Sequence, residues 1–425
     1  MDRSHLIAAN INRGKALYEQ KRYQEAYKCF QNIEHCHGND YNYLYFYGRL
    51  KLQNRENSDA RKLFLQALKL NNSNELDLYI AIATTYYQDC DFNKAISISQ
   101  LILKNKEITS ELENYLQELI CYCYLSMGDL TKGWQLYNYR KPGLLVKAQL
   151  AKKCNLPFWQ GENKPNANLL VVAEDGLGDE LIYTSFIHLL PDKVKQVYLE
   201  CDARLIPLFA RTYPDIIFFA RNNIDSFKKA AKHCDMCVLL GDLPRYLIPE
   251  MAKGKTIALK PAHKFKKNLP NNKSLVGISY YTPVPNSEYR MPPLDFWEKI
   301  FKACPGVAFI NLQENKKTDP KKRSFLYNHK SVQQINEVDL YNDLNGLAEL
   351  ICHMDFVLSI SNYIAHFTGR LARPSALVAQ KFCNCRWILA EDPSPWYPTL
   401  KLIRGKEVGG WEEVKNNVIN ILHEL

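Results

Sequence analysis

Residues 169–180 read LLVVAEDGLGDE, an apolar run that ends at a glycine-containing loop. Short continuous apolar runs are typical of strands buried on both faces of a parallel sheet. Helical periodicity follows the loop and continues to Leu190. The stretch therefore predicts a strand, a turn and a helix, which is the repeating unit of a doubly wound α/β fold.

The loop of this unit contains Gly176 and Gly178. Glycines at the carboxyl end of a parallel strand let a substrate approach the backbone closely, so both are candidate cleft residues. Their spacing is neither the G-x-G-x-x-G of dinucleotide sites nor the G-x4-G-K-S/T of triphosphate sites. The loop thus indicates a ligand site without identifying the ligand.

Strands and helices continue to alternate after this unit. Further apolar runs occupy residues 197–200, 216–219, 236–240, 275–279, 307–312 and 356–360. We therefore expect an α/β protein with two Rossmann-like lobes, residues 169–265 and residues 266–425, each built on a parallel sheet. Lys141-Pro142-Gly143 is expected to break the helices before them, so residues 141–168 are predicted to be a linker.

The N-terminal third repeats itself with a period of 34 residues. Small and aromatic residues recur at matching positions: Gly14, Ala26 and Phe30, then Gly48, Ala60, Phe64 and Ala67, with looser units at Ala83, Ala95 and Ser99 and at Cys121, Gly133 and Tyr137. This period is typical of tetratricopeptide (TPR) helix pairs. Residues 1–140 are predicted to form an α-helical TPR solenoid whose groove binds a protein partner. A plain helical bundle is the alternative.

Composition limits the function classes. The 425 residues are 46% hydrophobic and 24% charged, which argues against a disordered chain. The net charge of +10 could indicate an anionic partner, but the lysines are scattered and the densest run, Lys316 to Arg323, is expected in a loop. We favour a solvated surface and expect no nucleic-acid partner.

Thirteen cysteines without a paired spacing predict free thiols of a reducing compartment. The C-x-C spacing at Cys121 and Cys123, and at Cys383 and Cys385, lacks the geometry of a zinc site, so we expect packing thiols and no metal. No apolar segment has the pattern of a signal peptide or the length of a membrane span. The expected location is the cytoplasm.

A second strand-to-helix turn is predicted at Ser361 to His366, after the apolar run 356–360. Unpaired backbone N–H groups and the helix dipole at such a turn favour a diphosphate. Ser361 and Asn362 are good helix N-caps. The alternative is that they only cap the helix and that His366 is a packed core histidine.

Motifs along the chain also occur together in one known family. They are GWQLYNYR at 133–140, PFWQG at 157–161, EDGLGD at 174–179, FINLQ at 309–313, the S-x5-A-H-x2-G-x-L-x-R-P pattern at 359–374, and SPWYP at 394–398. With them the chain resembles bacterial TPR-containing glycosyltransferases of the two-lobed GT-B fold. These are related to heptosyltransferases and, more distantly, to protein O-linked N-acetylglucosamine transferases. The resemblance covers roughly residues 120 to 415.

The resemblance implies a glycosyltransferase that uses a nucleotide-sugar donor. Asp179 matches the family aspartate proposed as the general base on the acceptor, and Gly176 and Gly178 belong to its cleft loop. His366 and Arg290, with the turn at Ser361 and Asn362, match the side that holds the donor phosphates. The helix dipole, Arg290 and His366 are expected to supply the positive potential, so neither a metal nor another cofactor is predicted.

The chain departs from the family at one position of this site. Ser361-Asn362 stands where the family usually has Asp-Thr, so a carboxylate is missing. An active transferase whose TPR groove selects a protein acceptor is the first hypothesis. A catalytically inactive GT-B-like scaffold, in which the TPR region binds partners, is the second. The sequence identifies neither the sugar, nor the nucleotide, nor whether the acceptor is a protein or a glycan.

Overall fold

The computed structural model describes residues 3–36, 39–70, 75–105, 107–174, 176–251, 257–262, 269–270, 272–284, 288–314, 329–388, 394, 396–407 and 409–425. They form two compact units, Met1–Met127 and Gly128–Leu425. The expected lobe boundary at residues 265 and 266, Asp175 and the lysine run 316–323 lie outside the described residues.

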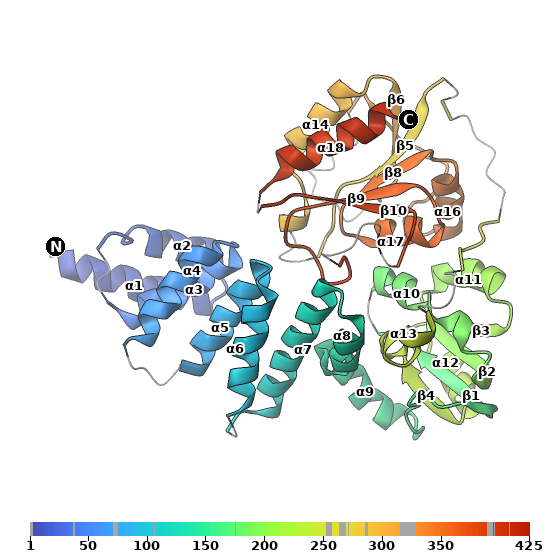
Figure 1. The fold of residues 1–425 in the computed structure, drawn as a ribbon, viewed down its shortest axis with the longest axis horizontal. Helices are drawn as coiled ribbons and strands as arrows, with labels where there is room; N and C mark the ends of the chain where they lie inside the picture. Colours follow the sequence, from blue (N-terminus) through green and yellow to red (C-terminus); the bar gives the residue numbers. More distant parts are fainter. Residues whose placement is uncertain are drawn as a thin grey trace. The chain divides into compact units, whose positions relative to one another are not determined.

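The first unit is a series of paired helices (Figure 1). Its helices are α1 (Arg3–Glu19), α2 (Tyr23–Gln31), α3 (Tyr41–Gln53), α4 (Asn57–Leu68), α5 (Glu75–Gln88), α6 (Phe92–Leu103) and α7 (Ser110–Met127). In the first two pairs the helices touch at a glycine: a Cβ on Gly14 would lie 2.6 Å from the Phe30 ring, and one on Gly48 would lie 2.6 Å from the Phe64 ring. The 34-residue recurrence thus corresponds to a repeated close contact between helices.

The second unit begins with helices in residues that the sequence predicted to belong to the helical repeats or to the linker. They are α8 (Leu130–Leu136), η1 (Tyr137–Tyr139) and α9 (Lys141–Lys153). The helices do break next to Lys141-Pro142-Gly143, at Arg140, whose ψ is 133°. The expected linker is wrong, however, since this segment begins α9 and Pro142 lies in its first turn, where its missing N–H is not needed. The compact units also divide at Met127, earlier than the boundary expected at residue 140. Arg140, which lies in the second unit, forms ion pairs with Glu174 and Asp242, which both follow strands of the first sheet.

The first sheet is four-stranded, parallel and ordered β3-β2-β1-β4. Its strands are β1 (Lys164–Val172), β2 (Val194–Cys201), β3 (Ile216–Ala220) and β4 (Met236–Leu239). The intervening helices are α10 (Leu177–Tyr183), η2 (Ile187–Leu189), η3 (Ala203–Leu205), α11 (Ile206–Thr212), α12 (Ile224–Lys232), η4 (Leu240–Asp242) and α13 (Leu243–Met251). β1 starts inside the expected linker. Only its last four residues are buried, and the apolar run in the sequence therefore predicted only that end of the strand.

The second sheet is six-stranded and ordered β10-β9-β8-β5-β6-β7, again with parallel pairs. Its strands are β5 (Ser274–Ser279), β6 (Val307–Asn311), β7 (Val332–Gln333), β8 (Phe356–Ser359), β9 (Ser375–Ala379) and β10 (Leu400–Arg404). Its helices are η5 (Glu288–Arg290), α14 (Leu294–Ala303), α16 (Leu344–Cys352), α17 (Tyr363–Arg370) and α18 (Trp411–His423).

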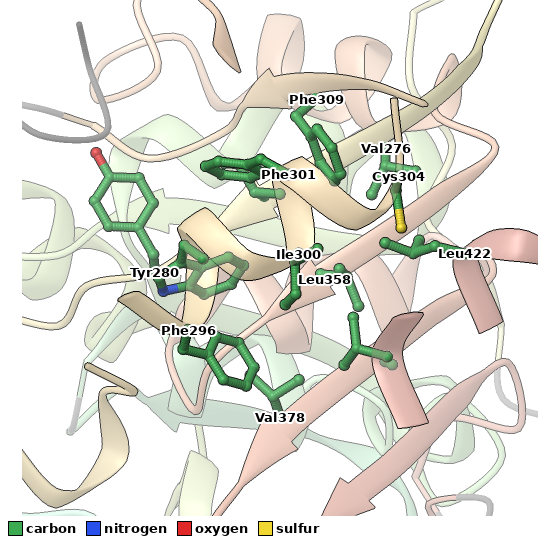
Figure 2. Packing of buried hydrophobic residues seen from close by; sticks show 14 of the residues in the cluster. Val276, Tyr280, Phe296, Ile300, Phe301, Cys304, Phe309, Leu358, Val378 and Leu422 are labelled. Atoms are coloured by element: carbon green, nitrogen blue, oxygen red, sulfur yellow. The ribbon is translucent and has the colours of Figure 1, made fainter. Parts of the chain in front are cut away.

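The core of this second lobe lies between the sheet and helices α14 and α18, which pack against each other. Figure 2 shows Phe301 beside Phe309, and Val378 of β9 beside Phe296 of α14. Burying such large apolar side chains contributes about 1.5–3 kcal/mol each. The packing holds the carboxyl ends of β5, β8 and β9 in a fixed arrangement.

The predicted α/β class with two parallel sheets is confirmed. Among the residues that the structure describes, no helix is both long and apolar enough to cross a membrane.

Candidate functional site

A cavity of about 440 Å³ lies in the second unit, at the carboxyl ends of strands from both sheets. Its wall is made of loops and helix starts that follow strands β1, β2, β5, β6, β7, β8 and β9: Gly176 to Asp179, Arg204, Tyr281 to Val284, Arg290, Gln313, Glu314, Tyr341, Ser361 to Tyr363, His366, Asn384, Arg386 and Trp387. Ligands of open parallel sheets bind at this edge. All seven residues predicted from the sequence therefore line one cavity.

The first turn at the cavity joins β1 to α10. Gly176 is the N-cap of α10 and contributes no side-chain cap, so Asp179 lies inside the first helical turn. Asp179 does not cap this helix, because the helix begins at Leu177. The Asp179 carboxylate instead forms an ion pair with Arg386 of the second lobe.

Two carboxylates near Asp179 in the sequence, Glu174 and Glu180, make structural contacts within the protein. Glu174 is buried and accepts hydrogen bonds from Arg140. Glu180 is buried, accepts from the backbone N–H of Asp202 at 2.7 Å and lies 3.2 Å from Arg221. Burial raises the pKa of Glu180 to about 7, although Arg221 acts in the opposite direction. Of these three carboxylates, only that of Asp179 reaches the cavity.

The second turn joins β8 to α17, and Asn362 is its N-cap. Its Oδ1 accepts from Ile364 N–H at 3.0 Å and from the Ser359 hydroxyl at 3.1 Å. Its Nδ2 donates to Ser279 Oγ at 2.7 Å and to the carbonyl of Tyr281 at 3.1 Å. The capping role expected from the sequence is present, and the same amide also fastens the β5 loop to this turn.

Ser361 and His366 contact one aromatic side chain that the sequence analysis did not select, Trp387. The Trp387 indole donates to Ser361 Oγ at 2.9 Å, and its ring stacks on His366 with centroids 4.5 Å apart. Nδ1 of His366 is 3.0 Å from the Tyr397 hydroxyl. Burial, with a smaller contribution from Arg386, lowers the pKa of His366 to about 3. His366 is thus a neutral ring at neutral pH and does not supply the positive charge expected of it.

The two turns meet at Gly178. A Cβ on this glycine would lie 3.1 Å from Cδ2 of His366 and 3.6 Å from Cα of Tyr363, so α10 approaches α17 more closely than most side chains allow. Gly176 is less crowded, since its Cβ would meet only Asp179 Oδ2, at 3.9 Å. Of the two glycines, Gly178 is therefore the one at which close packing of the helices leaves little room for a side chain.

Three arginines supply positive charge to the cavity wall, against the two carboxylates Asp179 and Glu314. Arg290, the predicted one, donates through Nε to Tyr289 Oη at 3.1 Å. Arg204 pairs with Asp202 at 2.7 Å and donates to the carbonyl of Tyr341 at 2.7 Å. Arg386 pairs with Asp179.

Sequence reasoning missed Arg204, Arg386 and Trp387, although a signal for each was present. Arg204 directly follows the predicted strand 197–200, and the other two lie between the family motifs at 359–374 and 394–398. Basic and aromatic residues just after a parallel strand are candidates for this edge of the sheet.

A metal site would need several His, Cys, Asp or Glu side chains close together among the described residues. No group of three or more His, Cys, Asp and Glu side chains in this part of the chain is arranged to hold a metal ion. Cys121, Cys123, Cys383 and Cys385 are buried free thiols, and Cys383 lies 3.4 Å from the carbonyl of Trp387. In these positions they fill core space.

No family model matches the chain. It is 27% identical over 332 residues to Protein FlbA of Caulobacter vibrioides, covering 71% of this chain and 54% of that protein. The chain thus spans about half the length of this curated relative.

Solved structures similar to the chain include two glycosyltransferases and an O-GlcNAc transferase. The iron-containing dodecameric glycosyltransferase TibC of enterotoxigenic E. coli has a TM-score of 0.44 at 13% identity, with 62% of this chain and 77% of that one covered. A family 9 glycosyl transferase of Veillonella parvula has a TM-score of 0.45 at 10% identity, with 63% and 100% covered. An O-GlcNAc transferase mutant of Thermobaculum terrenum has a TM-score of 0.34 at 12% identity, with 100% and 92% covered. A glycosyltransferase and an O-GlcNAc transferase, two groups that the sequence motifs resemble, are among the structures similar to the chain.

Proposed function

We propose that the cavity binds a nucleotide sugar and that the chain is a GT-B-type glycosyltransferase. The observation that carries the proposal is a cavity formed by the carboxyl ends of two parallel sheets and lined by three arginines. Its volume falls in the range of small-molecule sites, and its arginines suit the fork geometry of phosphate oxygens. A donor in this position contacts both lobes at once.

The donor diphosphate belongs on the second lobe, near the start of α17. The first N–H groups of a helix have no intrahelical acceptor, and the dipole favours an anion there. Arg290 and Arg386 line the same cavity as this helix start and add charge that His366 lacks. Leaving-group stabilisation therefore comes from guanidinium groups and the helix end, without a requirement for a metal.

Asp179 acts as the general base in this proposal. It removes the proton from the acceptor hydroxyl while that oxygen forms a bond to the anomeric carbon of the sugar. The bond between that carbon and the diphosphate oxygen breaks, and the departing nucleoside diphosphate keeps the bonding electrons. Asp179 is suited to this step because its carboxylate reaches the cavity from the lobe opposite the phosphate-binding turn.

The helical first unit is proposed to be a TPR array that selects a protein acceptor. Support comes from the 34-residue recurrence and from the identical contacts of Gly14 with Phe30 and of Gly48 with Phe64. Such arrays bind peptide segments or partner proteins along their length. An acceptor hydroxyl on a serine or threonine fits the proposed chemistry.

One observation favours the second candidate, an inactive scaffold. Both polar atoms of the Asn362 side chain bond to protein groups, so one of the two residues in place of the family's Asp-Thr holds the turn together. In this alternative the cavity keeps its fold without transferring a sugar.

Calorimetric titration with ADP, UDP, GDP and CDP, followed by mass spectrometry of candidate acceptors with the matching nucleotide sugars, tests the function. We expect one diphosphate to bind and its sugar to be transferred in the presence of EDTA. The double variant Asn362→Ala/His366→Phe should weaken diphosphate binding by about 1 to 3 kcal/mol.

Asn223→Ala is the matched control. Asn223 caps α12 through a 3.0 Å bond to Ser226 N–H, outside this cavity, so its loss should affect stability but not nucleotide binding. Nucleotide binding without transfer supports the scaffold, whereas an absence of nucleotide binding contradicts the transferase.

A further inference from the structure

We propose that Arg386 is a shared cation: it neutralises Asp179 in the empty site and transfers to the donor diphosphate when the donor binds, which frees Asp179 to act as base. The inference rests on the proposed function and adds a residue and an order of events to it. It assigns Arg386 as a phosphate-binding residue and makes donor binding precede activation of the acceptor.

The ion pair itself joins the two lobes. Asp179 lies at the start of α10, after the first sheet's β1, and Arg386 lies in the loop after the second sheet's β9. Both side chains keep 21% of their surface exposed and both line the cavity. A diphosphate that enters the cavity therefore meets the pair from the solvent side.

Arg386 is positioned for an anion by contacts that do not use up its donors. Asn384 Oδ1 accepts from the Arg386 backbone N–H at 3.0 Å and from Nη1 at 3.1 Å, and the carbonyl of Arg386 accepts from the Trp396 indole at 2.8 Å. Its Nη2 lies 3.4 Å from the Tyr183 hydroxyl. Its Nε is buried and donates to no acceptor among the described residues.

A guanidinium has five donors, so the carboxylate and these neutral contacts leave Arg386 able to bind a further anion. A diphosphate offers more charge and more acceptor oxygens than a single carboxylate, and arginine binds such groups through two parallel bonds. The diphosphate is the stronger competitor for Arg386 at this position.

The other two cavity arginines lack this link to the base. Arg204 is paired with Asp202, which does not line the cavity, and Arg290 contacts Tyr289. Of the three, only Arg386 has the proposed base as its charged partner in the described contacts. While that pair persists, Oδ1 of Asp179 accepts from the guanidinium and is not available to an acceptor hydroxyl.

A double-mutant cycle on nucleoside diphosphate binding tests the shared cation. The wild type, Asp179→Asn, Arg386→Gln and the double variant are titrated by calorimetry with the diphosphate that the wild type binds best. Asp179→Asn should tighten binding by about 5- to 50-fold, because the competing anion is gone, and Arg386→Gln should weaken it by about 10- to 100-fold. In the Arg386→Gln background the tightening caused by Asp179→Asn should disappear.

Arg221→Gln is the control. Arg221 also pairs with a carboxylate of α10, that of Glu180, but it does not line the cavity. The diphosphate affinity of the Arg221→Gln variant should therefore match that of the wild type. If Arg386→Gln does not fold, Arg386→Lys takes its place and should retain a smaller tightening. Equal tightening by Asp179→Asn in both Arg386 backgrounds shows simple charge repulsion and overturns the shared cation while leaving the proposed function intact. Failure of the wild type to bind any nucleoside diphosphate overturns both.

Discussion

The two strand-to-helix turns at the cavity are held in place by different forces. The turn from β1 to α10 depends on charged pairs: Arg140 with Glu174, Arg386 with Asp179 and Arg221 with Glu180. The turn from β8 to α17 is held by neutral hydrogen bonds of Asn362, Ser361 and His366. One turn thus presents a carboxylate paired with a cation, and the other presents a frame of neutral hydrogen bonds.

This difference suits the two proposed tasks. A base must accept and release a proton, so its turn needs a carboxylate and a nearby cation that can change partner. A phosphate-binding turn must keep its geometry while the charge of the ligand changes, and neutral amide and hydroxyl bonds do not titrate. The same strand–turn–helix topology therefore supports two kinds of chemistry in one cavity.

The largest expected effect comes from removing the buried cation behind the first turn. Arg140→Met leaves Glu174 without its cation, with both side chains only 1% exposed. Breaking one side of a buried ion pair costs about 3–5 kcal/mol in the free energy of unfolding. Urea denaturation of the whole chain measures this free energy. Lys299→Met, which breaks an exposed ion pair, is the control, and its free energy of unfolding should be close to that of the wild type. A small change in Arg140→Met shows that the first turn does not depend on charge.

Asp179→Asn separates the tasks of the two turns. Transfer should fall by roughly 100-fold or more, the usual range for loss of a general base, while donor binding is not weakened. Single-turnover kinetics and calorimetry measure the two quantities. Asp192→Asn, an exposed carboxylate outside the cavity, is the control. Transfer at the wild-type rate by Asp179→Asn contradicts the assignment of the base.

Part of the pH dependence of stability should come from Glu180, in the first turn. The pKa of Glu180 is raised from 4.5 to about 7, so the folded state holds this proton more tightly than the unfolded chain. The stabilisation is present below pH 4.5 and is lost as the pH rises through about 7. Glu180→Gln should therefore reduce the loss of stability between pH 5 and pH 8 by about 2 kcal/mol. Thermal unfolding at both pH values tests this, and an unchanged difference excludes Glu180 as its source.

The smallest effect is expected where the two turns touch. In Gly178→Ala the new Cβ lies 3.1 Å from Cδ2 of His366, whose ring is fixed by Trp387 and Tyr397. Overpacking at this contact should cost about 1 kcal/mol. Gly306→Ala, where no atom lies within 4 Å of the added Cβ, should not destabilise the protein. Equal melting temperatures for the two variants indicate that the turns have room to move apart.

Much of the site could be predicted from the sequence, because short sequence patterns indicate its strands, turns and caps. The apolar run 169–173 marked β1, and the glycines after it marked the loop that faces the cavity. The second turn was equally visible, since Asn362 has the chemistry of a cap and follows a strand. These features depend on neighbouring residues, so a sequence window of a dozen residues contains them.

Other features involve residues that are close only after folding. Pro142 suggested a break, but the helix α9 forms because a proline in the first turn lacks only a bond that the helix does not make. His366 was expected to carry charge, yet packing against Trp387 and Tyr397 removes the water that its charged form needs. Burial of this kind is a property of the assembled core.

The sequence by itself determined the two parallel sheets, the repeating helix pairs and the position of Asp179 at a strand's carboxyl end, because hydrophobic periodicity and glycine spacing are local. Only the tertiary structure decided that Arg386 pairs with Asp179, that Arg140 supports Glu174 and that His366 is neutral. The partners in these pairs are separated along the chain, and the dielectric environment of each group is set by residues from several elements. Ion pairing and pKa depend on that shared environment, so they are decided when the lobes pack.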